Sequence, residues 1–273
     1  VRSRRQRQMC IRDSMSAMLD HVVAQILTLQ VRLLACRERL AANTDSEALH
    51  DLRITLRRLR SLLRPLRGLP GVEQLEDAAR SLGTLTTPLR DREVLAAELI
   101  GRGHAAAGQR RLEGRDRTFA SVATSPQLAR VLAILDAFPL FLRAADREGL
   151  VKSLGKRIDK RLVKQWRKLH KALQDPAHDR HRLRLLIKRA RYGDEAYPQL
   201  DHAGKKLQRL LKKAQGNLGD WHDRLQWLLQ ARDHADLLPC KAGWEQELHE
   251  AERQSDVTLD ALQEALARRY HGK

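Results

Sequence analysis

Residues 49–67 read LHDLRITLRRLRSLLRPLR, and this stretch decides how the chain folds. Its leucines recur every three or four residues, which places them on one face of a helix. Its cations recur with the same period, fall within one arc of about 80° beside the leucines, and are His50, Arg53, Arg57, Arg60 and Arg64. The stretch therefore predicts a helix that buries its leucines in a core and carries a row of cations next to that core.

The same pattern returns later in the chain. HRLRLLIKRAR at residues 181–191 follows the order of HDLRITLRRLR at residues 50–60, and the matched cations are offset by 131 positions (181 − 50). The second row of cations consists of His181, Arg184, Lys188 and Arg191. Downstream, NLGDWHDRLQWLL at residues 217–229 resembles SLGTLTTPLRDREVL at residues 81–95. Similar order and near-constant spacing indicate a duplicated helical unit.

Composition and periodicity both favour helices. Hydrophobic residues make up 42% of the 273 positions, glycine and proline are few, and no stretch alternates apolar and polar residues long enough for a sheet. We expect an all-α protein of two antiparallel helical bundles, residues 15–145 and 146–273, related by an internal pseudo-two-fold duplication. Residues 1–14 show no helical pattern and are expected to be a non-native or disordered prefix.

Periodic segments set the expected helices, and glycine, proline or capping residues separate them. TLTTP, at residues 84–88, is expected to break one helix, and QDPAHD, at residues 174–179, to separate two others. The expected helices are residues 19–40, 47–67, 71–83, 91–112, 115–145, 147–174, 179–197, 201–217, 221–236 and 241–269.

The chain is strongly basic, with a formal net charge of +18. A compact fold with this excess repels itself, which indicates an anionic partner: a nucleic acid, a membrane surface or a phosphate polymer. The cysteines, Cys10, Cys36 and Cys240, lack metal-site spacing and are expected to be free thiols in a reducing compartment. We find no run of about 18 apolar residues and no signal peptide, so no membrane span is expected.

Each row places like charges about 5–6 Å apart on a helix, where they are destabilising unless something neutralises them. A solvated helix face normally mixes signs at this spacing, whereas neither row holds an acid. Acids from neighbouring helices are one source of neutralisation, and a ligand is the other. We interpret the rows as ligand-binding, and phosphate fits because arginine donates in a fork to phosphate oxygens while lysine supplies a point charge.

Two further segments are strongly basic. Residues 152–171 hold nine lysines or arginines and one acid, Asp159, and residues 205–213 hold five and none. If these helices converged in one bundle, they would line a groove together with the rows. Lys212 and Lys213 are therefore weaker candidates for the same site.

These motifs resemble the conserved histidine α-helical domain, or CHAD domain, family. The resemblance covers nearly the whole chain from Met15 and implies two helical bundles related by internal pseudo-symmetry. It also implies non-catalytic binding of inorganic polyphosphate by basic side chains on a surface between them. The matching residues are His50, Arg53, Arg57, Arg58 and Arg60, then His181, Arg184, Lys188, Arg189, Arg191 and Tyr192, with Leu-Gly…Asp segments at 82–91 and 218–223. Arg58 and Arg189 lie off the rows and join the site only through this resemblance.

The chain departs from the family pattern at one point. TLTTPL separates the first Leu-Gly from Arg90-Asp91, so a role for Arg90 does not carry over. Some relatives also carry a triphosphate tunnel enzyme domain. No acidic, alternating-strand barrel appears here, and we expect a stand-alone member.

Two other anionic partners are weaker alternatives. Proteins that bind single-stranded nucleic acid set aromatic side chains among their cations, and only Tyr192 and Trp166 lie near the basic segments here. A membrane surface is also less favoured, because the apolar faces of the basic helices are needed for a core and bulky aromatic anchors are scarce.

A metal-dependent, phosphate-processing enzyme is the alternative of a different class. His178, Asp179 and His181 cluster in the sequence, and His222-Asp223 lies in the second Leu-Gly segment. A helix start capped by Asp179 is the simpler interpretation. The sequence has no HExxH motif, carboxylate cluster or glycine-rich phosphate loop, and the surrounding positive charge opposes a cation.

Several other residues have structural interpretations. Asp91 and Asp223 are expected to cap helices or form structural pairs, and Glu195 is expected to pair with Arg191 one turn before it. The tryptophans expected in the core are Trp221, Trp227 and Trp244.

We therefore expect an all-α protein that binds inorganic polyphosphate without catalysis and needs neither a cofactor nor a metal. The expected site is the two rows together with Arg58, Arg189, Lys212 and Lys213. The expected location is the cytoplasm, with polyphosphate granules as one place of association. The oligomeric state is left open.

Overall fold

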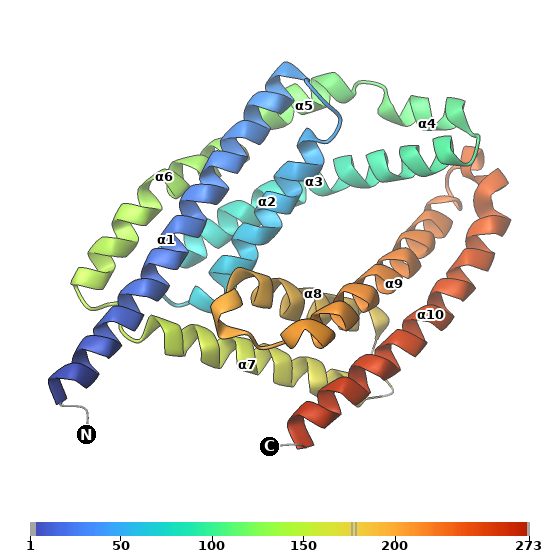
Figure 1. Cartoon of the computed structure of the whole chain (residues 1–273). Helices are drawn as coiled ribbons and strands as arrows, with labels where there is room; N and C mark the ends of the chain where they lie inside the picture. The colour runs from blue at the N-terminus through green and yellow to red at the C-terminus, as the bar shows by residue number, and fades with distance from the viewer. Residues whose placement is uncertain (1–3, 176, 178, 272–273) are drawn as a thin grey trace. The chain divides into compact units, whose positions relative to one another are not determined.

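The computed structural model describes residues 4–175, 177 and 179–271, and every regular element among them is a helix (Figure 1). The all-α expectation is therefore confirmed. The short 3-10 helices are η1 (Arg64–Leu66), η2 (Pro198–Leu200) and η3 (Ala235–Leu237). The α-helices are α1 (Arg4–Ala42), α2 (Ala48–Leu63), α3 (Val72–Gly101), α4 (Ala105–Leu112), α5 (Arg115–Ala123), α6 (Pro126–Arg147), α7 (Leu154–Leu173), α8 (Arg180–Ala196), α9 (Gly204–Gln230) and α10 (Leu238–His271).

The described residues form two compact units, which do not coincide with the halves expected at 15–145 and 146–273. The first unit ends at Val94 and resumes over Arg110–Lys160, and the second combines Leu95–Gln109 with the chain from Arg161 onwards. Residues 95–109 join the second unit because the end of α3 bonds to α10. Trp244, fully buried in α10, donates from Nε1 to Glu98 Oε1 at 3.1 Å.

In the first unit, α1 packs against α2, α5 and α6 (Figure 1). Polar pairs hold α1 along α6, because Gln30 Nε2 donates to Asp136 Oδ1 at 3.1 Å and Arg143 pairs with Asp20 at 3.1 Å. The leucine face expected for α2 is buried, with exposures of 3% or less, at Leu49, Leu52, Leu56, Leu59 and Leu63. The leucine spacing in the opening stretch thus predicted the correct core face.

In the second unit, the C-terminal part of α7 packs with α8, α9 and α10 around one core. α9 and α10 lie side by side (Figure 1), and Asn217 Nδ2 bridges them by donating to the Gln254 carbonyl at 3.0 Å and to Thr258 Oγ1 at 2.8 Å. The core includes Trp166 and Leu169 of α7, Leu183, Ile187 and Ala190 of α8, Leu207, Leu211, Ala214 and Leu218 of α9, and Leu259, Leu262 and Leu266 of α10.

Several helices are longer or shorter than the sequence indicated. α1 begins at Arg4, so residues 4–14 belong to a helix although their sequence shows no helical pattern. The expectation that this prefix is non-native or disordered stays a prediction. The two helices expected over 201–217 and 221–236 are replaced by one long helix, α9 (Gly204–Gln230), which is followed by η3. The helix expected over 115–145 is interrupted at Ser125, whose hydroxyl accepts from Leu128 N at 3.3 Å and caps α6, with Pro126 at its first position.

α3 runs through Pro88, so the expected break at TLTTP is wrong. Proline removes a backbone donor from a helix interior. In the preceding turn, side chains donate to the carbonyls: Thr86 Oγ1 to Leu82 O at 2.9 Å and Thr87 Oγ1 to Gly83 O at 2.8 Å. Arg53 of α2 donates to the same Gly83 carbonyl at 3.3 Å. Contacts from another helix therefore support a helix that the local sequence disfavours.

One segment, residues 17–42 of α1, is long and apolar enough to cross a membrane by length and composition alone, with a mean hydropathy of 1.3. Core helices pass the same test, so this is a weak indication. Here the apolar side of α1 faces the first unit, with Val22, Ile26, Leu33 and Leu40 buried. The expectation of no membrane span stays a prediction.

The first unit contains one buried carboxylate with a defined partner. Glu76 of α3 is 2% exposed, and Arg67 donates to it from Nε at 2.6 Å and also from Nη2. Burial alone would raise the pKa of Glu76, but the hydrogen bonds and charge of Arg67 outweigh it and lower the pKa below its ordinary value. Ionised Glu76 thus stabilises the fold above the ordinary carboxyl pKa, and this stabilisation is lost as the pH falls.

Arg67→Met is expected to lower the free energy of unfolding by about 2–3 kcal/mol at pH 7, because it leaves the Glu76 carboxylate buried without its partner. The loss should shrink as the pH falls and Glu76 becomes protonated. Denaturant unfolding at several pH values measures both effects. Arg80→Met in α3 is the control, since it removes an exposed pair with Asp77 and should cost less than about 1 kcal/mol. Equal losses in the two variants would contradict the prediction.

Candidate functional site

The first row of cations lies along α2, beside the buried leucines. Arg53 is half-buried, and its Nη1 donates to the Gly83 carbonyl at 3.3 Å, to Thr86 Oγ1 at 3.1 Å and to Thr87 Oγ1 at 3.0 Å. All three acceptors are uncharged and belong to α3. The guanidinium is therefore fixed in position without being neutralised by a hydrogen-bonded carboxylate.

Partial burial makes the positive charge of Arg53 energetically unfavourable. Burial lowers the pKa of its guanidinium, the Asp91 carboxylate raises it, and the neighbouring cations Arg90 and Arg57 lower it further. Arginine stays protonated throughout the physiological range. Arg53 is thus a permanent cation in a partly desolvated place, where electrostatic interactions are stronger than in water.

The other members of the first row differ in exposure. Arg57 is exposed, whereas His50, Arg60 and Arg64 are half-buried. Arg60 and Arg64 lie near enough to Glu76 to lower the pKa of its carboxyl. One carboxylate, already bonded to Arg67, therefore offsets part of the charge at this end of the row.

The second row lies along α8, which begins at a well-formed cap. The Asp179 carboxylate accepts from His181 N at 3.2 Å and Arg182 N at 3.0 Å, so the expected capping role of Asp179 is confirmed. Arg180 anchors the same helix end by donating from Nη2 to both Asp256 oxygens, at 2.8 and 2.9 Å. After this start, His181 is exposed, and Arg184 and Lys188 are half-buried.

The second row meets a histidine that sequence reasoning did not assign to the phosphate site. His222 of α9 lies with its ring centroid 5.4 Å from that of His181. Burial lowers the pKa of His222, the charges of Arg184, His181 and Lys188 lower it further, and the value falls from an ordinary 6.5 to about 4. His222 is therefore neutral at pH 7 because burial and crowded cations oppose its protonation.

Asp223 lies next to His222 and faces the same cations. Burial raises the pKa of its carboxyl, although the charges of Arg184, Lys188 and Arg224 lower it. The expected capping role is wrong for both Asp223 and Asp91, because each lies inside a long helix, α9 or α3, and not at its start. The expected structural pairing is present only as charge interactions, between Asp223 and Arg184 and between Asp91 and Arg53.

Arg191, at the end of the second row, is engaged locally. It pairs with Glu195 on the same helix at 2.7 Å, which confirms the expected intrahelical pair. Its Nη1 also donates to Gln215 Oε1 at 3.0 Å, and its guanidinium lies 4.9 Å from the Tyr192 ring centre. The charge of Arg191 is thus offset by the Glu195 carboxylate.

The remaining candidates lie on the surface. Arg58, Arg189, Lys212 and Lys213 are all exposed, as expected for residues off the rows. α7 exposes a further basic face at Lys164, Arg167, Lys168 and Lys171. The expected core tryptophans, Trp221, Trp227 and Trp244, are all buried, which confirms that prediction.

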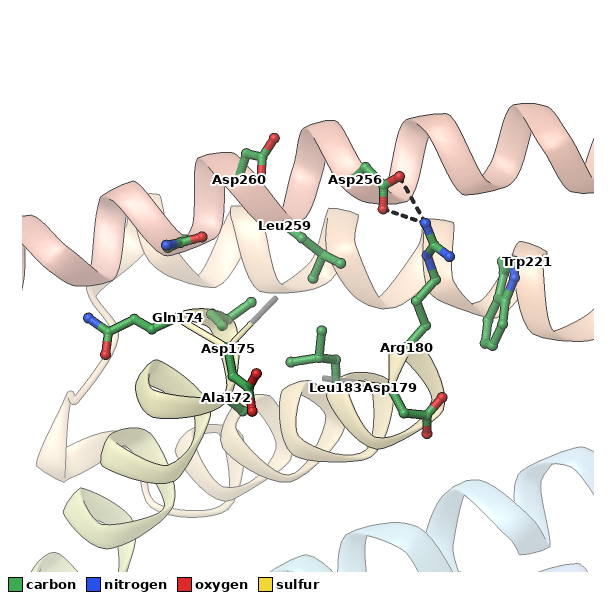
Figure 2. Close-up of a pocket in the computed structure, with 12 residues that line it drawn as sticks. Ala172, Gln174, Asp175, Asp179, Arg180, Leu183, Trp221, Asp256, Leu259 and Asp260 are labelled. Carbon is green, nitrogen blue, oxygen red and sulfur yellow. Dashed lines mark hydrogen bonds and ion pairs between the residues drawn. The ribbon is translucent and has the colours of Figure 1, made fainter. Parts of the chain in front are cut away.

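A pocket of about 670 Å³ in the second unit has the wrong charge for an anion (Figure 2). Asp175, Asp179, Asp256 and Asp260 line it, and among the described lining residues Arg180 is the one cation, already paired with Asp256. The other described lining residues are apolar or uncharged. A polyanion would be repelled here, so the pocket and the cationic rows are separate features.

Among the residues that the structure describes, no three histidine, cysteine, aspartate or glutamate side chains are grouped as metal ligands. His178, one of the residues considered for a metal site, lies outside the described residues. Cys36 and Cys240 are free thiols, as expected, and both are buried.

These features define a class of protein: an all-helical chain in which one helix of each unit carries a row of exposed and half-buried cations beside its buried apolar face. A family model for the CHAD domain matches residues 25–232, and the chain belongs to the CHAD domain family. The resemblance seen in the sequence is confirmed.

Among solved structures, the crystal structure of the CHAD domain from the plant Ricinus communis is similar to this one, with a TM-score of 0.64 and 22% sequence identity. The similarity covers 91% of each chain, and at this identity it shows a shared fold. A comparison with curated protein sequences found no match.

The geometry around His222 yields a test that needs no ligand. Arg184→Met is expected to raise the pKa of the His222 imidazole from about 4 towards its ordinary value, because it removes a nearby cation and keeps most of the packing volume. The imidazole resonances followed by NMR through a pH titration measure this pKa. Arg189→Met, on the exposed side of α8, is the matched control and should leave the pKa unchanged. An unchanged pKa of His222 in the Arg184→Met variant would contradict the close approach of Arg184 to the His222 imidazole.

Proposed function

We propose that this protein binds inorganic polyphosphate without catalysis, through the cationic rows of α2 and α8. The observation that carries the proposal is the cluster on α8, where half-buried Arg184 and Lys188 share one helix face with His181, whose ring lies 5.4 Å from that of His222. The charges of these three residues add to burial in lowering the pKa of His222 to about 4. Burial and this concentrated positive potential together keep the imidazole neutral. A phosphate oxygen placed there would relieve the repulsion among the cations, which is the physical basis of the affinity.

The chemistry of the rows matches a polymer with charge on every unit. Arginine donates in a fork to phosphate oxygens, and the half-buried Arg53 and Arg184 are partly desolvated, which strengthens each contact. Helical spacing repeats the cations at intervals of one turn along each row. The CHAD domain family is associated with polyphosphate and triphosphate binding in general, which agrees with this chemistry.

Contacts within each unit also support the proposed internal duplication. In the first unit, Arg53 of α2 donates a hydrogen bond to the Gly83 carbonyl of α3, and the charge of Asp91 raises its pKa. In the second unit, Arg184 and Lys188 of α8 act on Asp223 of α9. Each basic helix thus meets the following Leu-Gly…Asp segment in its own unit. We propose that the two units are copies of one ancestral helical bundle.

Nucleic acid is the less favoured ligand because the aromatic side chains near the second row are already engaged. Tyr192 accepts a hydrogen bond at its hydroxyl from Gln215 at 2.8 Å, and Trp221 donates from Nε1 to Glu252 at 3.3 Å. Both residues are buried, as is Trp166. A single-strand binder needs exposed rings on which bases can stack.

The double variant Arg57→Glu with Lys188→Glu is expected to weaken polyphosphate binding about 100-fold, because it replaces a charge-assisted contact in each row by repulsion. Helicity by circular dichroism should be unchanged, since neither side chain belongs to the buried leucine faces. Arg130→Glu with Arg232→Glu is the control, with the same change in net charge at two exposed positions outside the rows. Equal weakening in both double variants would show that net charge alone, and not the rows, provides the affinity.

Binding to polyphosphate, tripolyphosphate and single-stranded DNA across a salt series tests the class of ligand. The logarithm of the affinity for polyphosphate should fall linearly with the logarithm of salt concentration, because each neutralised phosphate releases a counterion. At fixed salt, polyphosphate should displace DNA. A preference for DNA would overturn polyphosphate as the ligand and favour the nucleic-acid alternative.

A further inference from the structure

Two imidazoles lie together in the second unit, and the proposed phosphate site was expected to use only one of them. The rings of His181 on α8 and His222 on α9 have centroids 5.4 Å apart and are tilted by 46°. The His222 ring nitrogens have no hydrogen-bond partner among the residues that the structure describes, and neither nitrogen is sealed from solvent. The imidazole is thus able to accept or donate a bond to a ligand.

The charged groups around His222 come from three helices. α8 contributes His181, Arg184 and Lys188, which all act on the imidazole. On α9, the sequence neighbour Asp223 is the near carboxyl, and Asp220 and Arg224 lie close to that carboxyl. From α10, Glu252 accepts a bond from Trp221 Nε1 at 3.3 Å, and the Trp221 ring lies 6.2 Å from that of His222. Cations therefore dominate on the side that α8 presents.

We propose that His222 is a further phosphate-contacting residue and that phosphate binding in the second unit is coupled to uptake of a proton by its imidazole. This inference rests on the proposed function. A phosphate group held by Arg184 and Lys188 brings negative charge to a place that is positive in the free protein. The imidazole then takes a proton from solvent, and the imidazolium N–H donates to a phosphate oxygen.

Linkage fixes the direction of the pH dependence. The free protein binds a proton at His222 with a pKa of about 4, and a bound phosphate raises this pKa because opposite charge favours the protonated form. Between the two pKa values the complex holds a proton that the free protein lacks, so affinity rises as the pH falls through this interval. If the bound value reaches the ordinary 6.5, the affinity should be about tenfold higher at pH 5.5 than at pH 7.5.

Asp223 also makes the affinity for phosphate rise as the pH falls, but through the loss of its own negative charge. Its carboxylate repels phosphate, and binding further raises a pKa that burial has already raised. Asp223→Asn should therefore strengthen binding at pH 7.5, because it removes a carboxyl group that opposes phosphate. The proton uptake at His222 should persist in this variant.

Titration calorimetry with long-chain polyphosphate tests the proposal on the full chain. Measurements at pH 5.5 and 7.5, each in two buffers of different ionisation enthalpy, give the number of protons taken up per complex. The internal phosphates of a long chain stay ionised over this range, so the polymer contributes little. Wild type should take up protons at pH 5.5, and His222→Gln should lose most of this uptake and most of the tenfold gain in affinity. His234→Gln, an exposed histidine outside the row, is the matched control and should behave as wild type.

A second measurement keeps the test independent of the variant's folding. The His222 resonances of the wild-type protein should titrate at a higher pH when polyphosphate is bound, and the same shift should occur in a His181→Gln background. Undiminished uptake in His222→Gln, or an unmoved His222 pKa in the complex, would overturn the coupling while leaving polyphosphate binding intact. Failure of the wild-type protein to bind polyphosphate at either pH would overturn the proposed function itself.

Discussion

The structure depends on helices that bury leucines on one face and carry cations on the adjacent face. In α2, Leu52, Leu56 and Leu59 are at most 3% exposed, and Arg53 lies half-buried beside them. Burial of the leucines fixes the rotation of the helix, so the cations have a fixed direction as well. The partial loss of water around these charges costs free energy, which the large apolar area of the helix offsets.

The groups that surround the partly buried cations differ between the two units. In the first unit, Arg53 donates to uncharged acceptors, which are the Gly83 carbonyl and the hydroxyls of Thr86 and Thr87. In the second unit, Arg184 and Lys188 lie near His222 and Asp223. Burial lowers the pKa of the His222 imidazole and raises the pKa of the Asp223 carboxyl, so it favours the neutral form of each. In both units, contacts with the neighbouring helix, α3 or α9, surround the partly buried cations of the row.

Several acids of the second unit lie away from its row. Asp175, Asp179, Asp256 and Asp260 line the pocket between α7, α8 and α10 (Figure 2), and Glu247 of α10 bonds to Arg102 and Arg224. Acids placed in this way cap and join helices without screening the row. Segregation of the two signs thus lets one bundle have both internal ion pairs and a strongly positive face.

The sequence by itself determined the helical class, the buried leucine face of α2, the cap at Asp179 and the Arg191–Glu195 pair, because each depends on spacing within one helix. It also carried the CHAD motifs, since these are local patterns. Only the tertiary structure decided that α3 continues through Pro88 and that His222 faces the second row. Bonds from Arg53 on another helix support the first, and the packing of α9 on α8 places the second. Both depend on contacts between residues far apart in the sequence, which periodicity along one helix does not record.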